Sequence, residues 1–353
     1  MSKLLSPLKI RDIELRNRIV ISPMCMYSAV DGFANDWHLV HLGSRATGGA
    51  GLVIQEATAV SPEGRISPGD LGLYNEGHIE MLQRITSFIH SQGAIAGIQI
   101  AHAGRKASCA KPWDGGKQVK KTDGGWTTVA PSALPFYPDD EAPQALDIDG
   151  IQKVIADFQN AAKRALKAGY KLVEIHAAHG YLVHQFLSPL SNHRTDSYGG
   201  SFENRIRLLL EIVEGVRGVW PLYLPLFVRI SATDWAEGGW NLDESVKLAA
   251  ILKDKGVDLI DTSSGGMVHN AKVTVGPGYM VPFAERIKKE SGILTGAVGL
   301  ITQAQQAEDI LQKGEADLIL IARESLRNPY FAINAAKELG DEHKWPLQYL
   351  RAK

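Results

Sequence analysis

The sequence has very few cysteines, with only Cys25 and Cys109 among its 353 residues. Two thiols cannot build a disulfide framework, a four-cysteine zinc site or a cysteine-ligated iron–sulfur cluster. Any redox chemistry of this chain must therefore come from a bound organic cofactor.

Long apolar segments and an excess of charge are missing as well. The N-terminus has no uninterrupted apolar stretch, and no window approaches the roughly 18 apolar residues of a membrane span. Lysine and arginine number 38 against 39 acidic residues, so nothing favours binding to nucleic acid or to an anionic membrane. We therefore expect a cytoplasmic protein that acts on a small molecule.

The sequence also lacks the Gly-x-Gly-x-x-Gly pattern of a dinucleotide-binding fold, and no repeat or linker divides it. What it does contain is eight apolar segments separated by helical patterns. These segments are Arg18–Met24, Gly51–Ala57, Ala94–Ala101, Lys171–His176, Leu224–Ser231, Val257–Asp261, Gly292–Ala297 and Ala316–Ile321. Eight strands alternating with helices predict an α/β fold, the (β/α)8 TIM barrel, as one domain over residues 1–353.

Three helices between these strands have clear signals. Apolar residues recur at helical spacing from Ile151 to Leu166 and again from Ile206 to Val216. Ser201 is placed to cap the second of these helices. A third helix is expected to open with the capping-box pattern Thr302-Gln-Ala-Gln305.

Two segments lie outside the repeat. Residues 4–17 alternate around Asp12 and predict an N-terminal hairpin that closes the bottom of the barrel. Residues 103–147 form a long excursion after the third strand, with Trp113 and Trp126. Because long loops in compact domains usually cover or bind something, we interpret this excursion as a lid over the active face.

Active sites of such barrels lie at the carboxyl ends of the strands, and the loops after strands seven and eight often hold a phosphate. Gly299 follows the seventh strand, and Ala322 and Arg323 follow the eighth. Their backbone N–H groups and the guanidinium could bind a phosphate monoester. Alternatively, the glycine only makes a turn and Arg323 pairs with a surface acid.

Other strand ends carry polar or sulfur-containing groups. These are Ser22, Pro23, Met24, Cys25 and Tyr27 after the first strand, Ala57 after the second, Gln99 on the third and Arg229 on the fifth. Cys25 is either a small buried side chain or a sulfur that tunes a cofactor. Gln99 and Arg229 could be satisfied core residues, but their clustering at one end of the barrel argues for a binding site.

The segment His176-Ala-Ala-His179-Gly-Tyr181 follows the fourth strand. The two imidazoles could form a structural pair or bind a metal, with His184, His193, Glu174 and Asp196 as further candidate ligands. Metal binding is the weaker alternative, because the spacing is not the helical i, i+4 spacing of a zinc protease. Two imidazole N–H donors could instead stabilise negative charge on a carbonyl or nitro oxygen, while Tyr181 donates a proton.

The stretch from His176 to Arg205 closely resembles the signature of the old yellow enzyme family. The blocks Ser22-Pro-Met-Cys25, Gln99-Ile-Ala-His-Ala-Gly-Arg105 and Arg323-Glu-Ser-Leu-Arg-Asn-Pro-Tyr330 also resemble family motifs, so the resemblance covers essentially the whole chain. The cysteine after Ser-Pro-Met is similar to that of the thermophilic-like branch.

The resemblance implies an FMN-dependent ene reductase without a metal, in which NADPH or NADH reduces FMN and an enone, enal, maleimide or nitroalkene then takes the hydride. It implies that FMN is bound by Ser22, Pro23, Met24, Cys25, Ala57, Gln99, Arg229, Gly299, Ala322 and Arg323. It also implies that His176 and His179 bind the substrate oxygen, that Tyr181 protonates the α carbon and that Tyr27 lines the pocket. Cys25 would also tune the flavin. Arg351 would reach a neighbouring active site in a homodimer or homotetramer.

Two departures from the family pattern stand out. Ala322 replaces a glycine, which could weaken retention of FMN, and Ala352-Lys353 replaces a C-terminal Gly-Trp. Related reductases with cysteine clusters and additional nucleotide-binding domains do not match a chain with two cysteines. A metal-dependent barrel hydrolase and a barrel that only binds ligands are the alternatives from other classes.

Overall fold

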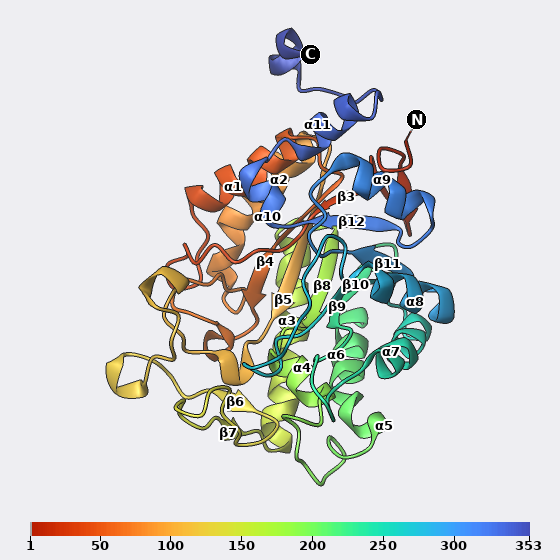
Figure 1. Cartoon of the computed structure of the whole chain (residues 1–353). Helices are drawn as coiled ribbons and strands as arrows, with labels where there is room; N and C mark the ends of the chain where they lie inside the picture. The colour runs from red at the N-terminus through yellow and green to blue at the C-terminus, as the bar shows by residue number, and fades with distance from the viewer. Residues whose placement is uncertain (1) are drawn as a thin grey trace.

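The computed structural model describes residues 2–353 and contains a closed barrel of eight parallel strands (Figure 1). The order around the barrel is β10-β11-β12-β3-β4-β5-β8-β9. The strands are β3 (Ile19–Ile21), β4 (Leu52–Ala59), β5 (Ile95–Ala101), β8 (Leu172–Ala177), β9 (Leu226–Ser231), β10 (Leu259–Ser263), β11 (Leu294–Ala297) and β12 (Leu318–Ile321). Each of the eight predicted segments overlaps one of these strands, so the TIM barrel is confirmed, although β4, β8 and β10 extend one or two residues beyond the predicted ends. The first strand ends early, which places Ser22 and Met24 in a loop.

Helices follow the strands and cover the outside of the barrel (Figure 1). They are α1 (Asp36–Thr47), α2 (Ile79–Ser91), α3 (Ile148–Lys167), α4 (Leu182–Leu187), α5 (Phe202–Arg205), α6 (Arg207–Arg217), α7 (Leu242–Asp254), α8 (Val281–Ser291), α9 (Ala304–Gln312), α10 (Arg323–Arg327) and α11 (Phe331–Glu338). The predicted face of α3 is buried, including Ile151, Val154 and Phe158. Each such buried side chain contributes about 1.5–3 kcal/mol, so this face fixes the helix on the barrel.

The predicted helix starts are partly confirmed. Ser201 accepts a hydrogen bond from the Asn204 N–H and caps the short helix α5. The capping box at Thr302 is wrong, because Gln303 is the N-cap of α9 and makes no side-chain capping bond. The Thr302 N–H is satisfied instead by the Gln306 side chain at 3.2 Å. The Gln306 side chain thus accepts the N–H that Gln305 was expected to accept, and the N-cap residue of α9 contributes no side-chain bond.

The predicted N-terminal hairpin consists of β1 (Leu8–Ile10) and β2 (Ile13–Leu15), which pair antiparallel. Ile10 and Leu15 are buried in one apolar cluster with Val20 and Leu52, which come from the amino-terminal ends of two barrel strands. The hairpin therefore closes the bottom of the barrel, as predicted.

The excursion after β5 contains the short strands β6 (Val129–Ala130) and β7 (Gln144–Ala145) and several single 3-10 turns (Figure 1). Its Trp113 ring packs edge-on against Tyr27, with 5.9 Å between ring centroids. The indole N–H of Trp126 donates to the Glu63 carbonyl at 2.9 Å. The excursion is thus anchored to the loops that follow β3 and β4.

The C-terminal segment after α11 projects beyond the body of the barrel and ends in a 3-10 helix over Leu347–Ala352 (Figure 1). Among residues 2–353, the helices are all too short or too polar to cross a bilayer.

Candidate active site

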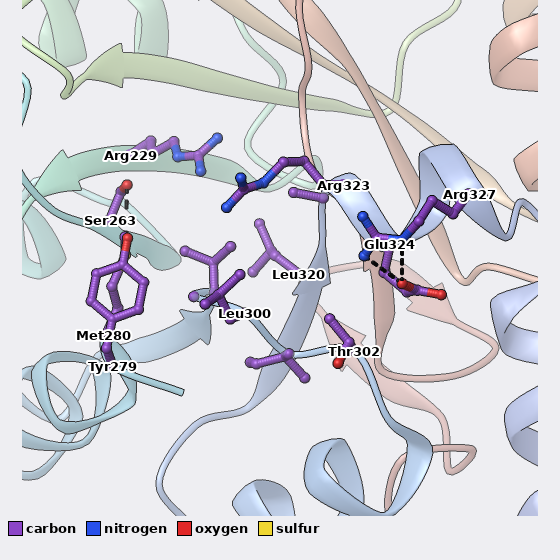
Figure 2. A pocket seen from close by; sticks show the side chains of 14 residues that line it. Arg229, Ser263, Tyr279, Met280, Leu300, Thr302, Leu320, Arg323, Glu324 and Arg327 are labelled. Atoms are coloured by element: carbon purple, nitrogen blue, oxygen red, sulfur yellow. Dashed lines mark hydrogen bonds and ion pairs between the residues drawn. The ribbon is translucent and has the colours of Figure 1, made fainter. Parts of the chain in front are cut away.

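One cavity of about 200 Å³ opens at the carboxyl ends of β9 to β12. It brings together four predicted cofactor residues that lie on or follow three strands, β9, β11 and β12: Arg229, Gly299, Ala322 and Arg323. Figure 2 shows that the guanidinium groups of Arg229 and Arg323 point toward one another across this cavity. Two cations that face one space make it a favourable site for an anion.

The two cations differ in their acidic partners because, over the residues that the structure describes, Arg229 pairs with a carboxylate and Arg323 does not. Arg229 Nε lies 3.1 Å from Asp261 Oδ2, and its NH1 donates to Ser22 Oγ at 3.3 Å. Glu324 instead pairs with Arg327, at 2.6 Å. No ion pair to Arg323 forms within residues 2–353. The charge of Arg323 is thus available to a ligand, in contrast to the alternative in which it pairs with a surface acid.

Gly299 has a local reason to be glycine. Its φ is +113°, a conformation that side chains rarely adopt, and an added Cβ would lie 3.1 Å from the Met280 backbone nitrogen. Without a side chain, the backbone at Gly299 lies directly against the cavity that this residue lines.

The two predicted oxygen-binding histidines and Tyr181 form a compact cluster at the end of β8. The His176 ring lies edge-on to both His179 and Tyr181, with 5.0 Å between centroids in each case. His179 Nε2 lies 2.6 Å from the hydroxyl of Ser263, a residue that lines the first cavity. Tyr181 lines a second cavity of about 360 Å³. The cluster therefore connects the two cavities.

The cluster is held by the backbone of its tight turn. Gly180 has φ +72°, and a Cβ there would lie 2.0 Å from the Gly266 carbonyl oxygen. The Gly180 N–H donates to His184 Nδ1 at 2.9 Å, and Gln185 donates to the Gly180 carbonyl at 2.7 Å. His184 Nε2 in turn lies 2.9 Å from Asp234, with both side chains fully buried. This network fixes the positions of His179 and Tyr181.

The same contacts bear on the metal alternative. Both nitrogens of His184 are engaged, and Arg194 binds the carboxylate of Asp196 at 2.5 Å. No group of three or more His, Cys, Asp or Glu side chains that could hold a metal ion occurs in the described part of the chain. His184 is a structural residue of the turn, and the geometry offers no ligand set for the metal alternative.

Burial sets the protonation states of the cluster. Burial, with the Arg229 charge as a smaller cause, holds the pKa values of His176 and His179 well below the usual range. The imidazoles are therefore neutral at pH 7. His176 Nδ1 accepts the Ala178 N–H at 3.2 Å, so its proton is on Nε2, which is free to donate. Burial also raises the pKa of Tyr181 well above its usual value, which keeps the phenol as a proton donor.

The second cavity lies beneath the excursion. Its lining includes the predicted Tyr27 and Tyr181, and the excursion contributes Lys106, Cys109 and Phe136. The Lys106 ammonium donates to the carbonyls of His179 and Gly266, at 2.8 and 3.1 Å. It also lies 4.4 Å from the centre of the Phe136 ring. The excursion thus forms part of the lining of the second cavity. Through the hydrogen bonds of Lys106 it also stabilises the turn that contains His179.

Sequence reasoning missed Lys106 and Ser263. A signal existed for both: Ser263 is the last residue of a barrel strand, and Lys106 comes just after another strand, at the edge where active sites lie.

The remaining predicted residues lie at different distances from the two cavities. Cys25 is half-buried, and burial raises the pKa of its thiol well above the usual value, so it is an uncharged thiol. Ala57 shares a small pocket with Tyr181. Gln99 is buried inside the barrel, where it donates to Glu174 at 2.7 Å. Arg351 is exposed in the projecting C-terminal segment, outside both cavities.

Comparisons with known proteins agree with this geometry. Residues 3–342 match the model of the NADH:flavin oxidoreductase / NADH oxidase family. The chain is 52% identical over 354 residues to an NADPH dehydrogenase of Listeria innocua, covering 100% of this chain and 99% of that protein. It is 48% identical to an NADPH dehydrogenase of Bacillus subtilis, covering 99% and 98%. An old yellow enzyme homologue from Zymomonas mobilis has a similar structure, with TM-score 0.78, 26% identity and coverage of 98% and 95%.

Proposed function

We propose that this chain, which belongs to the NADH:flavin oxidoreductase / NADH oxidase family, reduces activated C=C bonds. As a member of this family it is an FMN-dependent oxidoreductase that uses NADPH. The proposed acceptors are enones, enals, maleimides and nitroalkenes. The observation that carries the proposal is the His176, His179 and Tyr181 cluster, which joins the cavity suited to an anion to the cavity beneath the excursion.

The residues around the first cavity have the chemistry to hold FMN. Arg323 and the backbone at Gly299 and Ala322 would bind the phosphate, and Gln99 and Arg229 would face the pyrimidine edge. Ser22, Pro23, Met24, Cys25 and Ala57 would complete the flavin site. When bound, FMN supplies two-electron chemistry between NADPH and the acceptor.

The chain's own groups would activate and protonate the acceptor. His176 Nε2–H and the His179 imidazole would donate to the carbonyl or nitro oxygen and stabilise the charge that develops there. Tyr181 would then give its proton to the α carbon. Because the imidazoles are neutral and the phenol is protonated at pH 7, each group is in the state that its role requires. Tyr27 and Lys106 would line the acceptor cavity, and residues 103–147 would serve as its lid.

We further propose a cytoplasmic homodimer or homotetramer that forms one barrel domain per chain. The C-terminal segment exposes Leu347, Tyr349 and Leu350, which favours burial against a second copy. Such an interface would bring Arg351 to a neighbouring active site.

The test separates FMN binding from acceptor chemistry. Purified protein should show flavin absorbance, lose it on anaerobic addition of NADPH, and regain it on addition of 2-cyclohexenone with formation of the saturated ketone. A yellow protein that is bleached by NADPH and not reoxidised by any enone, maleimide or nitroalkene would contradict the proposed acceptor class.

A further inference from the structure

Two carboxyl groups lie inside the barrel with too little positive charge to balance them. Glu174 on β8 and Asp261 on β10 are both fully buried. Among the described residues, Glu174 Oε2 and both oxygens of Asp261 have no hydrogen-bond donor. Arg229 is the cation that faces the pair, and its Nε lies 3.1 Å from Asp261. One positive charge, that of the Arg229 guanidinium, therefore faces two carboxyl groups.

Each acid is in contact with a residue that is proposed to contact the flavin. Gln99 pairs with Glu174 across neighbouring strands and donates to it at 2.7 Å. Arg229 pairs with Asp261 in the same way. A change in the charge of either acid would therefore act on the pyrimidine edge of bound FMN through one intervening side chain.

We propose that Glu174 and Asp261 are positioning residues that take up a proton when bound FMN is reduced, and that they thereby set its reduction potential. The inference rests on the proposed function. NADPH delivers two electrons and one proton as a hydride and leaves as NADP⁺. Reduction of bound FMN by this hydride would leave one additional negative charge in the site, and the balancing proton would come from water and bind one of the two carboxylates.

The electrostatic surroundings support this uptake. Burial, and after it the charge of Asp261, raise the pKa of Glu174 to about 8, against the opposing effects of Arg229 and of the Gln99 hydrogen bond. Burial raises the pKa of Asp261 to about 6, again opposed by Arg229. His176, the other titratable group on this face of β8, is neutral. A new negative charge nearby raises both pKa values, so Asp261 gains a proton from just above pH 6 and Glu174 from just above pH 8.

The experiment measures the reduction potential of the FMN-loaded protein from pH 5.5 to 9.5 by spectroelectrochemistry. Wild type should take up more than one proton per two electrons above pH 6. At pH 7, Asp261→Asn should raise the equilibrium constant for reduction about tenfold, or about 30 mV, because it removes the cost of protonating a group one pH unit above its pKa. Glu174→Gln should match wild type at pH 7 and exceed it about tenfold at pH 9.

Glu308→Gln is the matched control. It neutralises another buried carboxylate, one that accepts the N–H groups of Lys3 and Leu4 far from the flavin site, and it should leave the potential unchanged at every pH. If a variant fails to fold, the pH dependence of the wild-type reduction potential still tests the inference. Uptake of one proton per two electrons across the whole range overturns the inference, as does a Glu174→Gln potential that equals wild type at pH 9. Failure to bind FMN would refute the FMN assignment instead.

Discussion

The buried pair of His184 and Asp234 gives a sharp test of how the active-site turn is held. Asp234 is fully buried, and each of its oxygens has separate partners. Oδ2 accepts from the Ser188 hydroxyl at 2.6 Å and from the Trp240 N–H at 2.8 Å. Oδ1 lies 2.9 Å from His184 Nε2. Because His184 Nδ1 accepts the Gly180 N–H, a proton on the ring is carried by Nε2, the nitrogen in contact with this oxygen.

Asp234→Asn should keep the two hydrogen bonds to Oδ2 and lose the contact of Oδ1 with His184 Nε2. The amide oxygen can replace Oδ2, but the NH2 group then faces the imidazole N–H, so two donors meet in a buried site. Removing one partner of a buried pair costs about 3–5 kcal/mol, and we expect the lower end, about 3 kcal/mol of unfolding free energy, because two bonds survive. The measurement is urea unfolding of the FMN-loaded protein, followed by circular dichroism.

Asp157→Asn is the matched control, since it makes the same change in the partly exposed pair with Lys153 and should cost less than about 1 kcal/mol. The pH dependence gives a second check. Burial raises the pKa of Asp234, but His184, Ser188 and Trp240 outweigh it and leave the pKa below the usual value. The stability from this carboxylate is therefore present above about pH 4 and lost as the pH falls through the lowered pKa. Equal losses for the two variants at pH 7 would refute this account of the turn.

Other predictions concern the proposed chemistry. Tyr181→Phe should slow reoxidation of reduced enzyme by an enone about 10²- to 10⁴-fold in stopped-flow experiments and leave reduction by NADPH nearly unchanged; equal slowing of both half-reactions would remove Tyr181 as the proton donor. His176→Ala should weaken binding of a phenolate ligand, read from its charge-transfer band with FMN, by about 10- to 100-fold, since one hydrogen bond to a charged oxygen contributes about 1.5–3 kcal/mol; unchanged affinity would contradict its role. Gly299→Ala should weaken FMN binding, whereas Gly314→Ala, also at positive φ but facing open space, should cost about 1 kcal/mol of stability without changing FMN affinity; similar FMN affinities of the two variants, by fluorescence titration, would argue against Gly299 at the phosphate.

The structure and the comparisons also separate the departures from the family pattern. Ala322 lines the first cavity beside Arg323, so its methyl group lies where it could affect the retention of FMN. The C-terminal replacement lies in the projecting segment, where its effect depends on a second copy of the chain.

Much of the fold and part of the site followed from the sequence alone. A parallel barrel strand is buried on both faces, so its apolar run identifies it without tertiary information, and all eight runs overlap a strand. Because parallel strands end at a common edge, the residues that follow them could be expected to meet, as Arg229, Gly299, Ala322 and Arg323 do. The four-residue pattern of a capping box was a weaker guide, because Gln303 is the N-cap of the helix and Gln306, not Gln305, accepts the Thr302 N–H.

Only the tertiary structure decided which groups face one another and in which protonation state. Periodicity could place Glu174 and Asp261 on strands, but their sharing of Arg229 depends on barrel register and closure. Likewise, His184 was a metal candidate until its contacts with Gly180 and Asp234 were known, and Asp234 is distant in sequence, in the segment that follows β9. The pKa values depend on burial, which each side chain acquires only when the whole barrel has packed around it.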